Sequence, residues 1–237
     1  MCRKTERFDR IVIMKLSLTF LALIISQLAF SQSESDKKLL KKDKYGEVYI
    51  THDTSRIEYK WLIPSYPDDN LHIYQEYYQH IKENINSALK FSNKLNNLSK
   101  WTPIYKINNK YYLYGPSDWM YNFGFIINDS TILRQFSDGP GVFVILNSNK
   151  VSDKVYQYKT LDYYKKETNI SIYIIDQTNE IAVWKFETQD EVQYELMINS
   201  NNIKKFPLVI RNCGNVKCVT EYEFIQPDFE KLIKTVR

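Results

Sequence analysis

The chain has 237 residues, enough for one domain or two small ones, with 43% hydrophobic residues, 25% charged residues and a formal net charge of +4. This balance is typical of a soluble globular protein, and it excludes a disordered chain and a protein with many membrane spans. Only 6 glycines are present, and neither GxGxxG nor GxxxxGK[ST], two glycine-rich patterns that bind phosphate groups, occurs in the sequence.

The first 31 residues have the features of a signal peptide. Basic residues precede an apolar run of 15 residues from Leu16 to Phe30, which is shorter than the roughly 20 residues that a membrane-spanning helix needs. Ala29 and Ser31 supply small residues at the −3 and −1 positions of a cleavage site, so the mature chain is predicted to begin at Gln32. We therefore expect an exported protein, periplasmic or extracellular. An uncleaved N-terminal anchor is the alternative.

Removal of this leader brings the predicted mature chain close to neutrality. Of the 32 basic and 28 acidic residues, the leader holds 5 and 2, which leaves a formal charge of +1. A charge near zero gives no support for binding to nucleic acid or to an anionic membrane. We expect neither a nucleic-acid partner nor stable membrane insertion after the leader is removed.

The start of the mature chain is predicted to hold a linker and then one helix of unusual length. Residues 32–46 are polar and show no clear periodicity, which indicates a linker before a single domain over residues 47–237. Residues 48–50 fit a short strand, whereas the type of element at 57–63 stays open. Apolar side chains recur at helical spacing over residues 71–98, which predicts a long helix with its apolar stripe facing the core.

From residue 101 the pattern changes to period two. About ten short segments separated by turn residues predict β-strands, and no helix-length stretch interrupts them, so successive strands should pair mainly antiparallel. Asn108 and Asn109, between two of these segments, tolerate the positive φ angles of a tight hairpin turn. The segments are 104–107, 111–114, 121–127, 131–136, 142–146, 155–158, 170–175, 181–186, 192–198, 206–210 and 219–225.

These elements together predict an α+β fold built on an antiparallel β-meander, either a curved sheet or a closed barrel. Segments such as 170–175 are apolar on both faces and need a cover, which the long N-terminal helix would supply. Pro227 is expected to open a short C-terminal helix with Phe229 and Leu232 on one face.

Cys213 and Cys218 are the cysteines that remain after the leader is removed. Four residues separate them and begin with Gly-Asn, which favours a turn, and apolar residues lie on either side. In an exported protein this arrangement predicts a disulfide that joins the two arms of a hairpin. Free thiols and a functional pair are the alternatives, although a redox-active pair usually has only two intervening residues.

The histidines give little support for catalysis or metal binding. His72, Glu76 and His80 are spaced to lie along one side of a helix and are of zinc-ligand type, but that side is opposite the apolar stripe. We expect a solvated face there, with no metal and no cofactor. His52 with Asp53 could join a distant serine in a triad, but the sequence has no GxSxG motif.

Three carboxylate pairs could supply general acid–base chemistry, which requires one buried acid beside an ionised partner. Nothing in the sequence indicates such burial, and the first two pairs fall in expected turns. The pairs are Asp68-Asp69, Asp190-Glu191 and Glu221/Glu223.

Aromatic residues are the largest surplus, at 15% of the chain with 19 Tyr and 12 Phe. Their flat apolar faces and polar tips suit a sugar, a lipid or a protein partner, whereas compositional bias and strand packing are the plainer explanation. An interior cavity above roughly 300 Å³ lined by Tyr and Trp would favour ligand binding. The candidate ligand-binding residues are Tyr112, Tyr114, Trp119, Tyr121 and Trp184.

The sequence thus favours an exported, non-enzymatic binding protein that uses an aromatic-rich β-domain for an apolar or carbohydrate-like ligand or a protein partner. One alternative is an exported hydrolase whose site is assembled from scattered polar residues. The other is a structural or partner-neutralising module that binds through a sheet edge or the exposed side of the helix.

Overall fold

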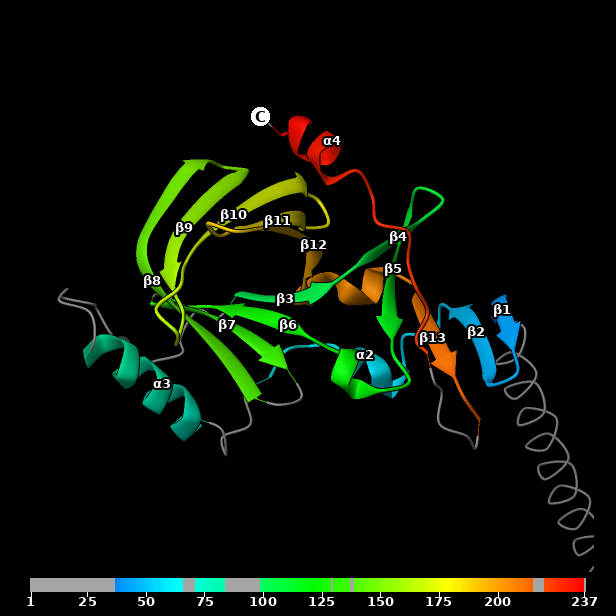
Figure 1. The fold of residues 1–237 in the computed structure, drawn as a ribbon. Coiled ribbons are helices and arrows are strands. Elements are labelled where there is room, and N and C mark those ends of the chain that lie inside the picture. Colours follow the sequence, from blue (N-terminus) through cyan, green and yellow to red (C-terminus); the bar gives the residue numbers. More distant parts are fainter. Residues whose placement is uncertain are drawn as a thin grey trace, which may run out of the picture.

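The computed structural model describes residues 37–65, 71–83, 99–128, 130–136, 139–214 and 220–236. The predicted leader and its cleavage site lie outside these residues, so both stay predictions. Within them the protein is mostly β, with a few short helices (Figure 1). None of the helices in this part of the chain is long and apolar enough to span a membrane.

Eight strands close into an antiparallel barrel in the order β10-β11-β12-β3-β6-β7-β8-β9. The meander from β6 to β12 pairs neighbour with neighbour, as the sequence predicts, and β3 closes the barrel by pairing with β12 on one side and β6 on the other. These strands are β3 (Ser99–Pro103), β6 (Gly124–Ile127), β7 (Thr131–Phe136), β8 (Gly139–Ser152), β9 (Val155–Leu161), β10 (Glu167–Asp176), β11 (Ile181–Glu187) and β12 (Val192–Asn199).

The barrel wall is apolar on both of its faces. Ile172 of β10 lies opposite Trp184 of β11, and both belong to the cluster inside the barrel. The next pair along, Tyr173 and Val183, points outward into a different cluster. Because successive strand residues alternate between faces, both faces of this wall need a partner that excludes water.

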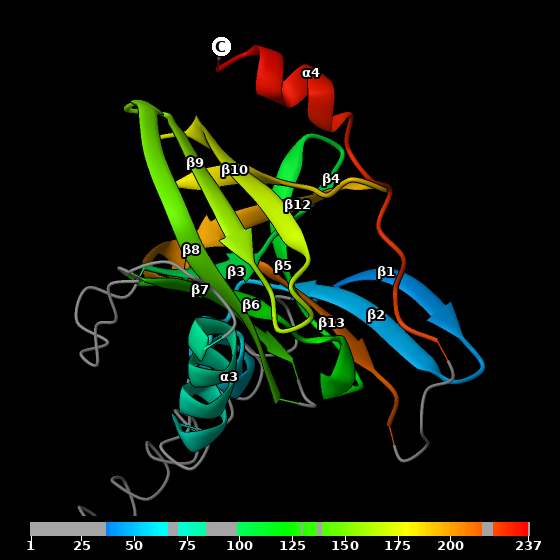
Figure 2. The ribbon, with the colours of Figure 1, turned by 60° about the vertical axis from the view of Figure 1, so that its left-hand side comes forward.

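A curved five-stranded sheet covers one side of the barrel, in the order β1-β2-β13-β5-β4 (Figure 2). Leu113, Leu208 and Ile210 of this sheet share a buried cluster with the outward residues of the barrel wall. Among the described strands, only β13 and β5 pair in parallel. The sheet consists of β1 (Lys38–Asp43), β2 (Gly46–Thr51), β4 (Tyr105–Ile107), β5 (Lys110–Gly115) and β13 (Leu208–Asn212).

The hairpin between β4 and β5 confirms the turn predicted from its two asparagines. Asn108 and Asn109 have φ angles of 47° and 64°, so both residues adopt the left-handed conformation that a tight two-residue hairpin requires. Asparagine accepts this conformation at lower cost than most residues, which explains why the turn forms at this point.

The long N-terminal helix predicted from the sequence is not shown. Helix α3 (Leu71–Glu83) has 13 residues, and residues 84–98 lie outside the described part of the chain. Ile81 of α3 packs with Leu133 and Val144 on the outside of the barrel, so the described part of the helix does cover a face of the wall. The predicted C-terminal helix is present as α4 (Phe229–Lys234), where the Asp228 side chain accepts a hydrogen bond from the backbone of Lys231.

Other segments differ from the expectations or settle what the sequence left open. Lys38–Asp43, within the predicted linker, forms strand β1, an edge strand that pairs with β2 and packs Leu40 against the sheet. Residues 57–63 begin with a short helix, α2 (Ile57–Trp61). The predicted strand at 219–225 is wrong over its described part, because residues 220–228 pair with no strand.

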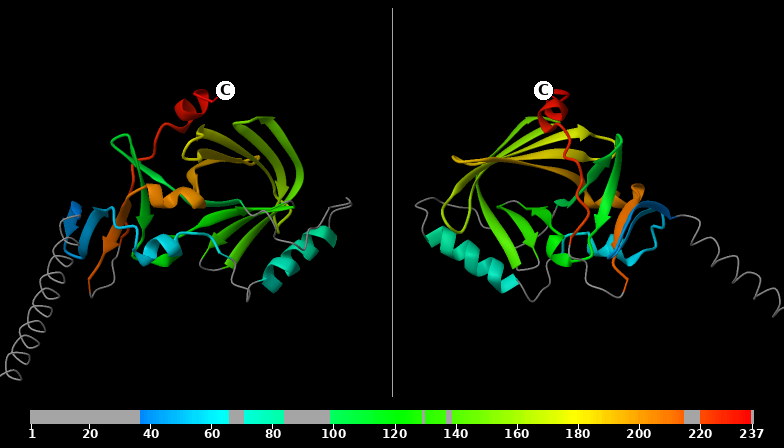
Figure 3. Two further views of the ribbon diagram at one scale, coloured as in Figure 1. Left: turned by 180° about the vertical axis from the view of Figure 1, so that it is seen from behind. Right: turned by 45° about the vertical axis from the view of Figure 1, so that its right-hand side comes forward.

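Residues 220–228 form an extended segment, here called the C-terminal strap, that runs beside the five-stranded sheet to α4 (Figure 3). Tyr222 and Phe224 pack against an apolar cluster of the sheet that includes Val48, Tyr114 and Val209. The strap is therefore held to the sheet by side-chain packing, and not by the backbone pairing that its alternating sequence predicts.

Candidate functional site

The middle of the barrel is filled by side chains. Trp184 and Phe125 are fully buried and stack with ring centroids 4.8 Å apart, and Trp101 meets Trp184 edge to face at 5.7 Å. Ile132 and Ile170, also fully buried, complete this layer. A filled layer of this kind blocks the interior of a small barrel, so a ligand could bind only at one of its two ends.

One end of the barrel holds a cavity of about 350 Å³, here called the barrel-mouth pocket. Its walls are mainly apolar and aromatic side chains from β3, β6, β9 and β10, and its rim carries polar side chains from strand ends and turns. The wall residues are Trp101, Ile127, Tyr156, Tyr158, Ile172 and Ile174, and the rim residues are Ser99, Asp153, Gln177, Glu180 and Asn199.

The aromatic wall follows from period-two alternation along β9. Tyr156 and Tyr158 lie two residues apart and therefore project from the same face of the strand, opposite Ile172 and Ile170 of β10. Trp101 adds an indole whose Nε1 donates a hydrogen bond to Ser99 Oγ at 2.7 Å. Burial raises the pKa of Tyr158, so its phenol stays protonated and can donate a hydrogen bond at neutral pH.

The rim carries two carboxylates that are held in place. Glu180 has a φ of 54°, unusual for a residue other than glycine, and its carbonyl accepts from the backbone of Asn199 at 3.0 Å. Its Oε2 accepts from Asn202 Nδ2 at 2.7 Å. Asp153 forms an ion pair with Lys150 at 2.7 Å, and this hydrogen-bonded partner lowers the pKa of Asp153.

The sequence-predicted ligand residues do not gather at one place. Tyr112 and Tyr114 lie together in the sheet cluster beneath the strap, whereas Trp184 is fully buried inside the barrel. Tyr121 is 63% exposed, and Trp119 begins a short 3-10 helix, η2 (Trp119–Tyr121), with a side chain outside the described part. Their role in binding stays a prediction.

The aromatic wall of the pocket was not among the sequence-based predictions. Tyr156 and Tyr158 could have been found from the alternation of β9, because tyrosines at i and i+2 share one face of a strand. Trp101 gave no such signal, since its place in the wall depends on β3 pairing with strands far away in the sequence.

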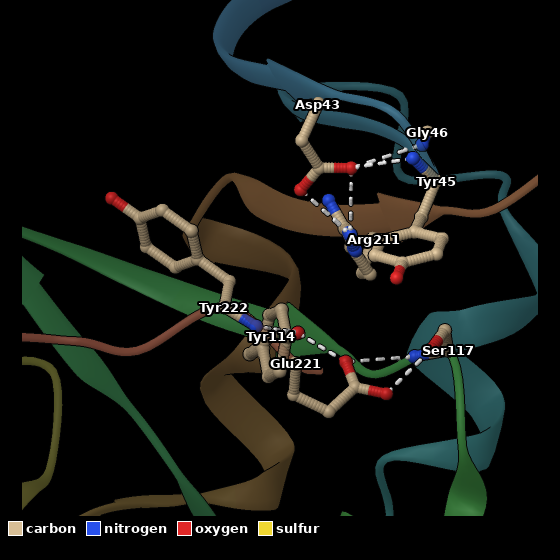
Figure 4. A network of polar contacts seen from close by, with 8 residues as sticks. All are labelled: Asp43, Tyr45, Gly46, Tyr114, Ser117, Arg211, Glu221 and Tyr222. Carbon is tan, nitrogen blue, oxygen red and sulfur yellow. Dashed lines mark hydrogen bonds and ion pairs between the residues drawn. The ribbon is translucent and has the colours of Figure 1, made fainter. Parts of the chain in front are cut away.

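Glu221, of the predicted Glu221/Glu223 pair, holds the strap in place (Figure 4). Its carboxylate accepts hydrogen bonds from the hydroxyl of Tyr114, the hydroxyl and backbone N–H of Ser117, and the backbone N–H of Asp118. The Tyr114 hydroxyl in turn accepts from the backbone N–H of Tyr222 at 2.9 Å. These donors already occupy both oxygens of Glu221, so the group is suited to anchoring the strap.

Figure 4 also shows an ion pair beside the strap anchor, between the first and third strands of the sheet. The buried guanidinium of Arg211 donates through Nη2 to both carboxylate oxygens of Asp43, at 3.1 and 2.9 Å. Asp43 also accepts from the backbone of Tyr45 and Gly46, and these contacts lower its pKa. The pair fixes the edge strand β1 on the sheet.

The remaining sequence candidates lie in scattered places. His72 is exposed, and the ring of His80 stacks on Tyr163 with centroids 4.5 Å apart. His52 is exposed, as are Asp190 and Glu191 in their turn, and Asp68-Asp69 lies outside the described residues. Over the described ranges, no group of three or more His, Cys, Asp or Glu residues is arranged to hold a metal ion. Cys218 is also outside them, so the disulfide stays a prediction.

Towards the opposite end of the barrel lies a charged pair. Arg134 and Glu195 are 3.9 Å apart, and the Arg134 guanidinium lies over the rings of Phe123 and Phe136 at 5.0 and 4.5 Å. Burial raises the pKa of Glu195, and the nearby guanidinium opposes that rise. The guanidinium of Arg134 thus has both a carboxylate and ring faces as neighbours.

Comparison of the sequence with protein-family models found no match, and comparisons with curated proteins and with solved structures found none either. The case for a function therefore depends on the geometry of the barrel-mouth pocket.

Proposed function

We propose that this protein is an exported, non-enzymatic binding protein that holds a small amphipathic molecule in the barrel-mouth pocket. The observation that supports this proposal is the cavity of about 350 Å³ with Trp101, Tyr156 and Tyr158 in its wall. Ligand pockets range from roughly 300 to 1,000 Å³ and combine apolar walls with a few polar groups, so this cavity lies at the small end of the range.

The distribution of polar groups determines which kind of ligand fits. The deeper wall residues, Trp101 and Ile172, are nearly fully buried, whereas Gln177 and Glu180 at the rim are exposed. A ligand with an apolar or ring-shaped body and one polar end would bury the body against the wall and leave the polar end at the rim. The flat face of a sugar ring also fits an aromatic wall of this kind.

The proposal is tested by native mass spectrometry of the protein purified from cells that export it. We expect a bound small molecule that is released on unfolding. Ile174→Trp places a larger side chain in the pocket wall and should remove this molecule. Ile225→Trp is the matched control, because Ile225 is 89% exposed on the strap, and it should retain the molecule.

Equal occupancy in both variants would place the ligand elsewhere and contradict the proposal. If no small molecule is bound, wild-type protein is titrated with a panel of amphipathic compounds, monitored by tryptophan fluorescence. No saturable binding in that panel would reject the pocket as a ligand site. The predicted alternatives, a hydrolase or a partner-neutralising module, would then take precedence.

A further inference from the structure

We infer that the barrel-mouth pocket selects an organic cation, such as an amine or a quaternary ammonium compound with an apolar body. This inference rests on the proposed function and names the class of ligand. It combines three observations: the charges of the pocket lining, a lysine ammonium of the protein itself that pairs at the mouth, and a rim glutamate held by hydrogen bonds from Asn199 and Asn202.

The charged residues of the described lining are both acidic, and three aromatic side chains lie beside them. The two carboxylates are Asp153 and Glu180, and none of the described lining residues is a lysine, an arginine or a histidine. Trp101, Tyr156 and Tyr158 present ring faces whose electron-rich centres attract cations, Trp most strongly. Because Asp153 is paired with Lys150, the carboxylate left without an ion pair in the described lining is Glu180. A cation entering the mouth is attracted by Glu180 and by the ring faces, whereas an anion is repelled by Glu180.

Lys150 shows what this environment favours. It lies opposite Tyr156 on the neighbouring strand, so the two side chains share a face of the barrel wall. Its Nζ lies 5.9 Å from the centroid of the Tyr156 ring and 2.7 Å from Asp153 Oδ1. A protein ammonium group therefore already pairs with one lining carboxylate beside one lining ring, in the arrangement that a cationic ligand would use.

Glu180 is the second carboxylate, and no lysine or arginine ion pair to it is present among the described residues. Its left-handed backbone conformation belongs to the turn between β10 and β11. The backbone N–H of Asn199 donates to the carbonyl of Glu180, and Asn202 Nδ2 donates to one oxygen of its carboxylate. The charge is thus positioned at the rim before a ligand binds. Glu180 is thus the group we expect to contact the positive end of the ligand.

Three water-soluble compounds with one carbon skeleton test this inference: 4-phenylbutylamine, 4-phenylbutan-1-ol and 4-phenylbutanoate. Their dissociation constants are measured at pH 7 by isothermal titration calorimetry and by tryptophan fluorescence. We expect the amine to bind about tenfold more tightly than the alcohol, and the carboxylate to bind most weakly. An alcohol or carboxylate that binds as tightly as the amine would overturn the inference.

Two variants localise the effect. Glu180→Gln keeps an acceptor for Asn202 and removes the charge. It should therefore lower the affinity for the amine about three- to fivefold and leave the affinity for the alcohol unchanged. Glu187→Gln is the control, because Glu187 is a partly exposed carboxylate at the far end of β11, paired with Lys185, and outside the described lining. It should change neither affinity. A Glu180→Gln protein with an unchanged preference for the amine would contradict the assigned role.

Lys150→Met separates a cation site from an anion site. Removal of this ammonium exposes the Tyr156 face and Asp153 to the ligand, so amine binding should strengthen about threefold. If the pocket instead used Lys150 to bind anions, this variant would bind 4-phenylbutanoate more weakly, and its affinity for the amine would not increase. Equal binding of all three compounds would reject the cation preference and leave the proposed function intact. Failure of all three, together with an empty pocket in native mass spectrometry, would reject both.

Discussion

The strap anchor gives a quantitative prediction for Tyr114→Phe, which removes one oxygen atom and keeps the ring. The lost hydroxyl donates to Glu221 and accepts from the backbone of Tyr222. The first of these is a hydrogen bond to a charged group, worth roughly 1.5–3 kcal/mol, and the second is worth about 1 kcal/mol. Because Glu221 keeps three other donors and is partly exposed, we expect a net loss of about 2 kcal/mol in the free energy of unfolding.

Urea unfolding followed by tryptophan fluorescence measures this loss, and hydrogen exchange at the Tyr222 amide localises it to the strap. Tyr194→Phe is the matched control, because the Tyr194 hydroxyl also donates to a glutamate side chain, that of Glu230 in α4, but at an exposed position. This bond raises the pKa of Tyr194 to about 12. An exposed pair of this kind contributes little, so the control should lose no more than about 0.5 kcal/mol. Equal losses in the two variants would refute the reasoning that the Tyr114 bond anchors the strap.

Two further predictions concern pH dependence and backbone geometry. Burial holds the pKa of Glu195 above its ordinary 4.5, so the folded state binds this proton more tightly than the unfolded state, and stability should fall as pH rises from 4.5 through the raised pKa. Glu195→Gln should flatten this part of the profile in urea unfolding and be at least as stable as wild type at pH 7; a steeper decline in the variant would contradict the assignment. Gly46→Ala should cost more than about 3 kcal/mol, because its Cβ would lie 2.1 Å from the carbonyl oxygen of Asn212. Gly214→Ala, with a φ of 59° and no atom within 4 Å of an added Cβ, should cost only about 1 kcal/mol in the same assay, and similar losses at both glycines would exclude the steric explanation.

The antiparallel strands could be predicted because their signals are local. The alternation along β10 and β11 and the Asn108–Asn109 turn each depend on a few neighbouring residues, and the structure agrees with both. Closure into a barrel was one of two architectures that fit the same pattern. It is decided by β3, whose three-residue pairings with β12 and β6 join segments remote in the sequence.

The failures of sequence prediction have physical causes as well. Strand β1 has four charged residues and two leucines, too little apolar pattern to predict a strand, and its place is set by backbone pairing, by the packing of Leu40 and by the bond from Arg211 to Asp43. The strap alternates like a strand, yet Tyr222 and Phe224 pack on a sheet face instead of joining an edge. Such outcomes depend on tertiary contacts that override local β-propensity.

The candidate ligand residues were only partly predictable. The tyrosine surplus led to aromatic side chains as candidates, and their density along the chain selected Tyr112 and Tyr114, which the structure uses to pack the sheet and the strap. The wall of the pocket is instead made by residues that converge only when the barrel closes, with Trp101 brought beside Tyr156 and Tyr158.

The central claim, that a ligand occupies the barrel-mouth pocket, is tested most directly by ¹⁹F NMR of protein labelled with 5-fluorotryptophan. The four tryptophan resonances are assigned with single Trp→Phe variants, and 4-phenylbutylamine is then titrated. We predict a saturable shift of the Trp101 resonance while that of Trp61, which is 49% exposed and not among the described lining residues, stays unchanged. If neither this amine nor 4-phenylbutan-1-ol shifts the Trp101 resonance, or if the shifts are confined to Trp61, the account is contradicted.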